Sequence, residues 1–102
     1  MGILEEYERG KLFFEYGDYI TAARILEPVV EESPDDVAPR LMLARAYYHS
    51  AQLRKSEREL RVILDHDPAE HYAHLMLGRC LQRQSRHDEA QPHLRIAQAM
   101  GI

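Results

Sequence analysis

Residues 43–56 read LARAYYHSAQLRKS and residues 77–90 read LGRCLQRQSRHDEA, and the two stretches share one register at an offset of 34 residues. In each, a small residue follows the leading leucine and a second small residue closes the stretch. The same two positions are small one period earlier, which gives the columns Gly10, Ala44, Gly78 and Ala22, Ser56, Ala90. A fixed period of a few tens of residues indicates an array of stacked supersecondary units.

Large apolar residues follow the same period, and prolines stand at its joints. The apolar columns are Phe13, Tyr47, Leu81; Leu26, Leu60, Leu94; and Val29, Ile63, Ala97, and the joints are Pro34 and Pro68. The length and punctuation of each period predict two helices with a tight turn between them. We expect helices over residues 3–16, 19–32, 37–50, 53–66, 71–84 and 87–100. The whole chain, 1–102, is then one all-α domain of repeats at about 3–36, 37–70 and 71–102.

Local signals support these boundaries. Gly17 can take a positive φ that ends a helix, and Asp18 can cap the helix that follows. Asp67 and Glu70 have the spacing of a capping box that opens the fifth helix, with Pro68 at the tolerated first position. Two further prolines, Pro28 and Pro92, fall inside predicted helices. A proline there removes a backbone hydrogen bond, so both positions predict kinks.

The small columns also predict how the helices pack. If Gly10 faces Ala22 and Gly78 faces Ala90, the two helices of a hairpin can approach closely. The columns that contain Leu26 and Val29 are then expected to pack on the neighbouring hairpin. Stacked hairpins of this kind form a solenoid.

The spaced set Leu-Gly, aromatic, Ala, large apolar, Ala, Pro resembles the tetratricopeptide repeat over essentially the whole chain. The third period shows it best, with Leu77-Gly78, Leu81, Asp88-Glu89-Ala90, Leu94 and Ala97. The resemblance implies a right-handed α-α superhelix of three helix-turn-helix repeats. It also implies that the first helix of each repeat lines a concave groove that binds peptides or protein segments, and it implies no enzymatic activity.

On that geometry, side chains from the three first helices form one stripe along the groove. They are Tyr7, Lys11 and Phe14; Leu41, Met42, Arg45 and Tyr48; and Tyr72, Leu75, Met76, Arg79 and Gln82. Within each helix the core of the set is spaced i, i+4, i+7, which keeps it on one face. The basic ladder of Lys11, Arg45 and Arg79 favours a protein partner that combines apolar anchors with carboxylates or a C-terminus. The alternative is that the three cations serve solubility alone.

Two other binding modes can be judged from the residues present. A subset of the family binds chaperone tails through a clamp that contains paired Asn, but this chain has no Asn, and Met42 and Met76 stand where the clamp needs polar groups. We therefore exclude that mode.

The last helix presents an apolar row, Leu94, Ala97, Met100 and Ile102, which predicts self-association or a covering partner helix. An end that tolerates water is the equal alternative.

Composition excludes several classes of function. The formal net charge of −4 argues against a nucleic-acid binder, and no apolar run is long enough to cross a membrane. His71 and His74 are spaced for a metal, but two ligands are too few for a transition-metal site, so a metal-dependent enzyme is the weakest alternative. Cys80 stands alone and reads as a core residue. We expect a cytosolic, non-enzymatic adaptor without a cofactor.

Overall fold

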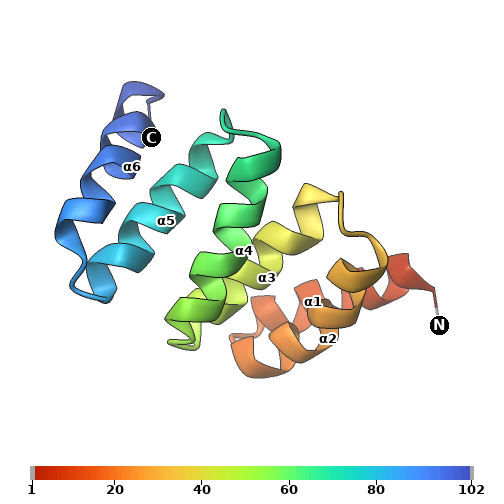
Figure 1. Cartoon of the computed structure of the whole chain (residues 1–102). Helices are drawn as coiled ribbons and strands as arrows, with labels where there is room; N and C mark the ends of the chain where they lie inside the picture. Colours follow the sequence, from red (N-terminus) through yellow and green to blue (C-terminus); the bar gives the residue numbers. More distant parts are fainter. Residues whose placement is uncertain (1, 102) are drawn as a thin grey trace.

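The computed structural model describes residues 2–101, and all regular structure in that range is helical. The molecule is elongated, with principal extents of 42 × 24 × 21 Å, and the two ends of the chain lie at opposite ends of it (Figure 1). The helices are α1 (Ile3–Glu15), α2 (Tyr19–Glu32), α3 (Val37–His49), α4 (Leu53–His66), α5 (His71–Arg83) and α6 (His87–Ala99). These bounds match the predicted ones to within one residue.

The helix starts follow the predicted chemistry in one case and depart from it in another. Asp18 accepts a hydrogen bond from the backbone N–H of Thr21 at 3.1 Å, and Gly17 adopts a φ of 82°, as the first turn predicts. The capping box at Asp67 is wrong. Asp67 instead accepts from the N–H of Ala69 at 3.1 Å within the turn, and Glu70 is the N-cap of α5 without a side-chain cap bond. Pro68 therefore lies in the turn rather than in the helix.

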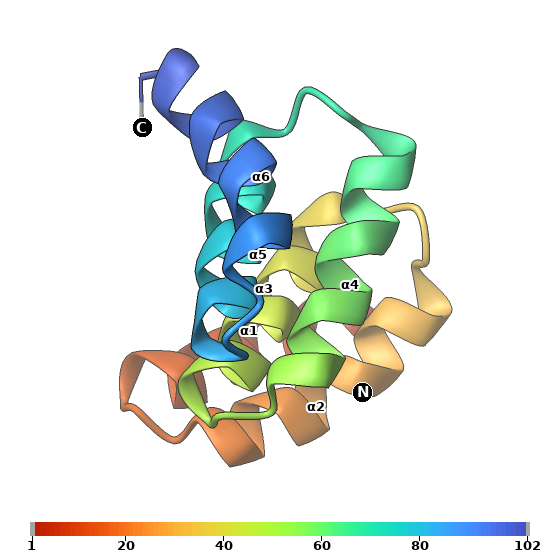
Figure 2. The ribbon, with the colours of Figure 1, turned by 60° about the vertical axis from the view of Figure 1, so that its left-hand side comes forward.

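Consecutive helices pack as antiparallel neighbours, and the hairpins stack in chain order. The first helices of adjacent hairpins also touch, because α1 contacts α3 and α3 contacts α5. Within residues 2–101, the second helices of adjacent hairpins make no such contact. The stack therefore curves, with α1, α3 and α5 on its inner face and α2, α4 and α6 on its outer face. Figure 2 shows α1, α3 and α5 one behind another, with α2 and α4 beside them.

The small columns hold the two helices of each hairpin close together, but not quite as predicted. Ser56 is fully buried and donates to the backbone carbonyl of Ala44 at 2.8 Å, so these two columns do face each other. The leucine column packs across the same interface. A Cβ atom added to Gly78 would lie 2.5 Å from Leu94 Cδ2, and one added to Gly10 would lie 2.7 Å from Leu26 Cδ2. The leucine column therefore packs within its own hairpin as well, while Leu26 also contacts the next hairpin as expected.

Two apolar cores run between the hairpins. One joins the first two repeats, where Leu26 and Val30 pack with Leu43 and Tyr47. The other joins the second and third, where Leu60 and Ile63 pack with residues of α5. Each hairpin therefore buries its apolar face on its neighbour, as a solenoid requires. Both α2 and α6 continue as α-helix through Pro28 and Pro92, and the kinks there stay a prediction.

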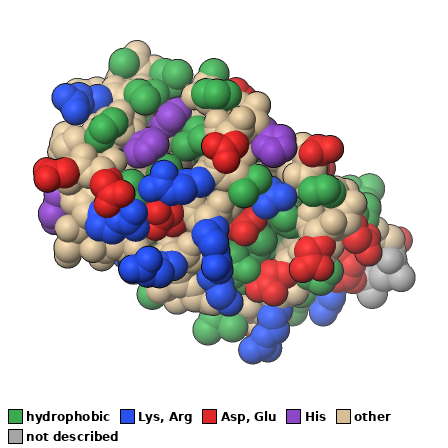
Figure 3. Space-filling view, viewed as in Figure 1, with side chains coloured by type: hydrophobic (Ala, Val, Ile, Leu, Met, Phe, Trp, Pro, Cys, Tyr) green, Lys and Arg blue, Asp and Glu red, His purple; other side chains and the backbone are tan. Residues whose placement is uncertain are grey.

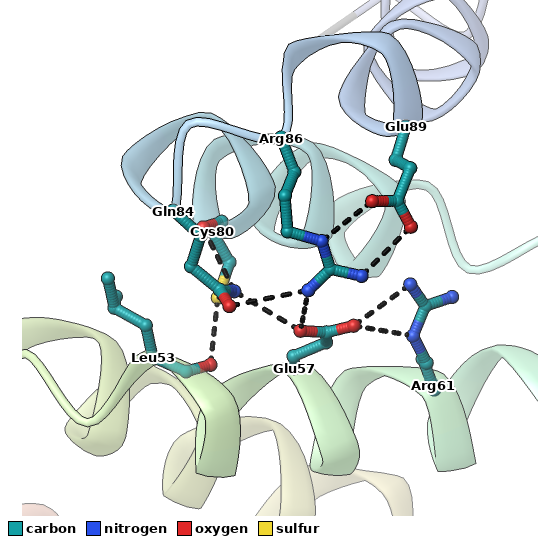
Figure 4. Close-up of polar contacts among 7 residues, drawn as sticks. All are labelled: Leu53, Glu57, Arg61, Cys80, Gln84, Arg86 and Glu89. Carbon is teal, nitrogen blue, oxygen red and sulfur yellow. Dashed lines mark hydrogen bonds and ion pairs between the residues drawn. The ribbon is translucent and has the colours of Figure 1, made fainter.

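A polar network reinforces the joint between the second and third repeats (Figure 4). Glu57 on α4 accepts from Arg86 at 2.7 Å, from Gln84 at 3.2 Å and from Arg61 at 3.0 Å. Burial raises the pKa of the Glu57 carboxyl, but the three donors outweigh it, and the pKa lies below its ordinary value. Glu57 thus ties the turn before α6 to the middle of α4.

Among the described residues, no helix is both long enough and apolar enough to cross a membrane.

Candidate functional site: the concave face

The side chain of Arg45 joins all three repeats on the inner face. Its guanidinium carbon lies 4.7 Å from the centroid of the Phe14 ring on α1 and 5.8 Å from that of Tyr72 on α5. Both distances fall within the range of cation–π attraction. Because Arg45 lies on α3, between these two helices, the predicted stripe is a continuous surface across the stack.

Arg45 also leaves one hydrogen-bond donor unused. Its Nε is buried, and among residues 2–101 it finds no hydrogen-bond acceptor. A buried donor left without a partner costs about 1–3 kcal/mol. Among the described residues, no carboxylate forms an ion pair with Arg45, so the charge of its guanidinium is not neutralised on this face.

An aromatic cluster beside Arg45 adds two residues, His49 and Tyr19, that are not among the predicted groove residues. His49, the last residue of α3, stacks on Tyr19 at 4.7 Å between centroids and meets Phe14 edge-on at 5.8 Å. Tyr19 and Phe14 are also in edge contact, at 5.1 Å. Burial lowers the pKa of His49 from its ordinary value, and the cations of Arg45 and Arg83 lower it further. At neutral pH the cluster therefore presents an uncharged imidazole.

Arg83 is the second addition, and the 34-residue register could have found it. Glu15, His49 and Arg83 form one column at the end of the first helices. Arg83 donates to the backbone carbonyl of Tyr48 at 2.9 Å, and its guanidinium carbon lies 4.7 Å from the Tyr48 ring centroid. Arg79, one turn earlier, is exposed and makes no ion pair within the described part of the chain. The cationic ladder is thus Arg45, Arg79 and Arg83.

Lys11, the remaining member of the predicted ladder, is less available. Its ammonium lies 3.7 Å from the Glu8 carboxylate and 5.4 Å from the centroid of the Tyr7 ring. The acidic character of the first repeat explains this, since residues 1–34 carry three basic and eight acidic side chains. Figure 3 views the outer face, with α2 and α4 in front, and there too acidic side chains crowd the end nearest the N-terminus while Lys and Arg spread over the middle. On the inner face, Arg45 lies on α3 and Arg79 and Arg83 lie on α5, so the cationic part of the groove belongs to the second and third repeats.

Most of the predicted groove residues lie half-buried or exposed on the inner face. The half-buried ones are Tyr7, Lys11, Phe14, Leu41, Met42, Arg45, Tyr48, Tyr72 and Leu75, and the exposed ones are Arg79 and Gln82. Met76 differs, because only 6% of its surface is exposed and it packs into the core between α4 and α5. It contributes to the core and is not available to a ligand.

The predicted self-association row on α6 exposes less apolar surface than the sequence suggests. Ala97 is 1% exposed, so it lies inside the third hairpin, and Leu94 is half-buried because it fills the space over Gly78. Met100 is exposed at 45%, whereas Ile102 lies outside the described residues. Leu94 and Ala97 turn inward because α6 packs them against α5.

His71 and His74, the two residues of the metal-dependent alternative, differ in burial. His71 is exposed at the start of α5, whereas His74 is buried and bonds to the Pro68 carbonyl and to His93. Across the described residues there is no group of three or more His, Cys, Asp or Glu side chains that could hold a metal ion. Cys80 is buried, and its thiol donates to the Leu53 carbonyl at 3.1 Å. Burial raises the pKa of that thiol.

A curved stack of three helical hairpins with a mixed aromatic and cationic inner face defines the class of helical-repeat protein-interaction modules. The sequence pattern of the tetratricopeptide repeat matches residues 13–76. The chain therefore belongs to the tetratricopeptide-repeat family, and its six helices form three repeats of that family's right-handed superhelix.

Solved structures give the same fold. A point mutant of MamA matches with a TM-score of 0.91 at 21% identity, over 98% of this chain and 73% of that one. MamA 41-end from Desulfovibrio magneticus RS-1 matches with a TM-score of 0.88 at 28% identity, over 95% and 55%. A chain of the CopN-Scc3 complex matches with a TM-score of 0.87 at 19% identity, over 93% and 56%. This chain thus spans little more than half of the last two. No curated protein matches the sequence.

Proposed function

We propose that this chain is an adaptor that holds a segment of another protein in its concave groove. The observation that carries the proposal is the position of Arg45, whose guanidinium lies between rings of the first and third repeats and whose buried Nε lacks an acceptor among the described residues. A partner carboxylate can pair with the guanidinium of Arg45, which is half-buried as a whole and has no ion-pair partner among the described residues. The structural likeness to a chain of a two-protein complex supports a protein ligand.

The chemistry of the groove defines the partner segment. Arg79 and Arg83 extend the positive charge of Arg45 along the second and third repeats, and Phe14, Tyr48 and Tyr72 supply half-buried aromatic surface between the cations. Such a surface favours a segment that alternates apolar anchors with carboxylates. Because these charges are partly exposed, they contribute more to the association rate and its salt dependence than to the final affinity.

Affinity capture followed by mass spectrometry tests the proposal. The bait is the full chain, as wild type and as Arg45→Met with Arg79→Glu. Methionine retains apolar contact with the Phe14 and Tyr72 rings while it removes the charge, so the variant tests recognition without opening the groove. We expect the captured segment to be lost from the variant, and its affinity for the wild type to fall with added salt.

The chain offers a matched control on the outer face. Arg24 on α2 and Arg54 on α4 are both exposed and make no ion pair within residues 2–101. Arg24→Met with Arg54→Glu removes the same charge from the opposite side of the molecule. If this control loses the partner as the groove variant does, net charge explains the binding and the groove assignment fails.

Self-association is the second candidate, and the described residues support it less. Of the apolar surface on α6, Met100 remains exposed together with Ile96, at 45% and 37%, while Ala97 is buried. Two partly exposed side chains form a small patch, below the size typical of a stable interface. Light scattering across a concentration series separates the candidates, because the adaptor function does not require a mass that rises with concentration.

A further inference from the structure

Two histidines meet in the third hairpin, away from the concave site. His74 on α5 is buried at 7% exposure, and its Nδ1 lies 3.1 Å from Nδ1 of His93 on α6. The two rings stack, with centroids 5.3 Å apart and planes 26° from parallel. They line a crevice of about 260 Å³ that opens between α4 and the third hairpin.

The neighbours of the pair assign its protons. The Pro68 carbonyl can only accept, so the 2.8 Å contact from His74 Nε2 requires that this nitrogen carry a hydrogen. In the neutral ring, His74 Nδ1 then has a lone pair, and His93 Nδ1–H donates to it. One proton occupies the space between the rings. A second proton on His74 Nδ1 would face the first and break this hydrogen bond.

The second repeat has the same joint built from different groups. Arg40 and Glu59 stand 34 residues before His74 and His93. Arg40 donates to the Pro34 carbonyl at 3.0 Å and to the Glu59 carboxylate at 2.7 Å. Both joints therefore link the first helix of a hairpin to its second helix and to the preceding turn. The Arg–Glu joint keeps its charges across ordinary pH, whereas the His–His joint gains charge on acidification.

The charged side chains around the histidine pair only partly oppose the uptake of positive charge on acidification. From α4, Arg61 and Asp65 face the crevice, so one added cation meets one positive and one negative side chain. Two cationic rings 3.1 Å apart also repel each other directly. We infer that the His74–His93 pair is an acid-sensitive joint, which fastens α6 to α5 and to the turn at Pro68 at neutral pH and releases α6 once both rings are protonated and His74 Nδ1 carries a hydrogen.

The electrostatics agree with this direction. Burial lowers the pKa of His93 from its ordinary value of 6.5, and the neighbouring His74 and Arg61 lower it further. A histidine whose folded pKa is depressed takes up a proton more readily in the unfolded chain. Its contribution to stability is therefore present above about pH 6.5 and is lost as the pH falls below that value. His49 acts in the same direction, so the test must separate the two.

Amide hydrogen exchange, corrected for the intrinsic pH dependence of exchange, measures the release locally. Between pH 7.5 and pH 5.0 we expect the protection of α6 amides to fall several-fold more than that of α2 amides in the wild type. The matched variant is His74→Arg with His93→Glu, which copies the joint of the second repeat and leaves His49 in place. We expect the difference between α6 and α2 to disappear in it.

A second measurement on the wild type alone tests the inference even if the double variant does not fold. Nuclear magnetic resonance of the imidazole carbons and nitrogens in the wild type follows each ring. We expect His93 to titrate below the ordinary value of 6.5 and to report the Nδ1–H tautomer at neutral pH. Titration of His93 at or above that value, or equal pH dependence of α6 and α2 protection, would overturn the inference.

Discussion

The guanidinium carbon of Arg45 lies 4.7 Å from the centroid of the Phe14 ring, so the second repeat reaches across the groove floor to the first. The same group lies 5.8 Å from the Tyr72 ring of the third repeat. One side chain therefore contacts all three repeats on the concave face. Its position explains why the groove forms one surface, and it makes Arg45 the first residue to replace.

Replacing Arg45 with methionine is expected to weaken partner binding more than it weakens the fold. The ring contacts are largely kept, and the lost cation–π attraction amounts to about 0.5–2 kcal/mol. The slope of log affinity against log salt should become shallower, because one groove cation is gone. Isothermal titration calorimetry at several salt concentrations measures the slope. An unchanged slope with unchanged affinity would place the partner elsewhere.

Gly78→Ala is expected to destabilise the chain although alanine favours a helix. The added Cβ would lie 2.5 Å from Leu94 Cδ2 and 2.7 Å from Leu94 Cγ, so the Leu94 side chain or the helix that carries it must shift. Overpacking of this kind costs about 1–3 kcal/mol, which exceeds the gain of about 1 kcal/mol in helix propensity. Urea unfolding measures the difference. Adding Leu94→Val should recover part of the loss, and no recovery would contradict the packing described.

Ser56 allows a milder test of the same interface. Ser56→Ala removes one buried hydrogen bond to the Ala44 carbonyl, so we expect a loss of about 0.5–1.5 kcal/mol. Ala22 and Ala90 hold the corresponding positions, which shows that alanine fits. Ser56→Val adds volume to a fully buried site and should cost more. Thermal unfolding of both variants ranks them, and the reverse order would be inconsistent with a close helix contact.

Glu57→Gln is expected to lower stability at neutral pH and to flatten its dependence on acid. The pKa of Glu57 is lowered below its ordinary value of 4.5, so its contribution is present above that pH and is lost as the pH falls through the folded pKa. We expect a loss of about 1 kcal/mol near pH 7, which shrinks at lower pH. Chemical unfolding at pH 7 and pH 3 measures this. Glu89→Gln, which changes an exposed partner of Arg86, serves as the control.

The period of 34 residues predicts the length, number and order of the helices, because the joint prolines and the small columns recur at fixed positions. The period predicts less well which side chains of a helix face the groove and which face the core. Met76 stands one residue from the groove position Leu75, and that offset of about 100° turns its side chain into the core. Ala97 is also buried, although the sequence predicts that the row containing it faces outward. The sequence also does not reveal that Arg45 reaches two rings, since this depends on the curvature of the stack.

Partner binding on the inner face of the stack is the feature on which the proposed function depends. Amide chemical-shift mapping examines it at every residue, with the captured partner segment titrated into isotope-labelled chain. The largest changes should fall on α1, α3 and α5, around Arg45, His49, Tyr72 and Arg83. Changes confined to α2, α4 and α6, with this stripe unperturbed at saturation, would show that the partner binds the outer face instead.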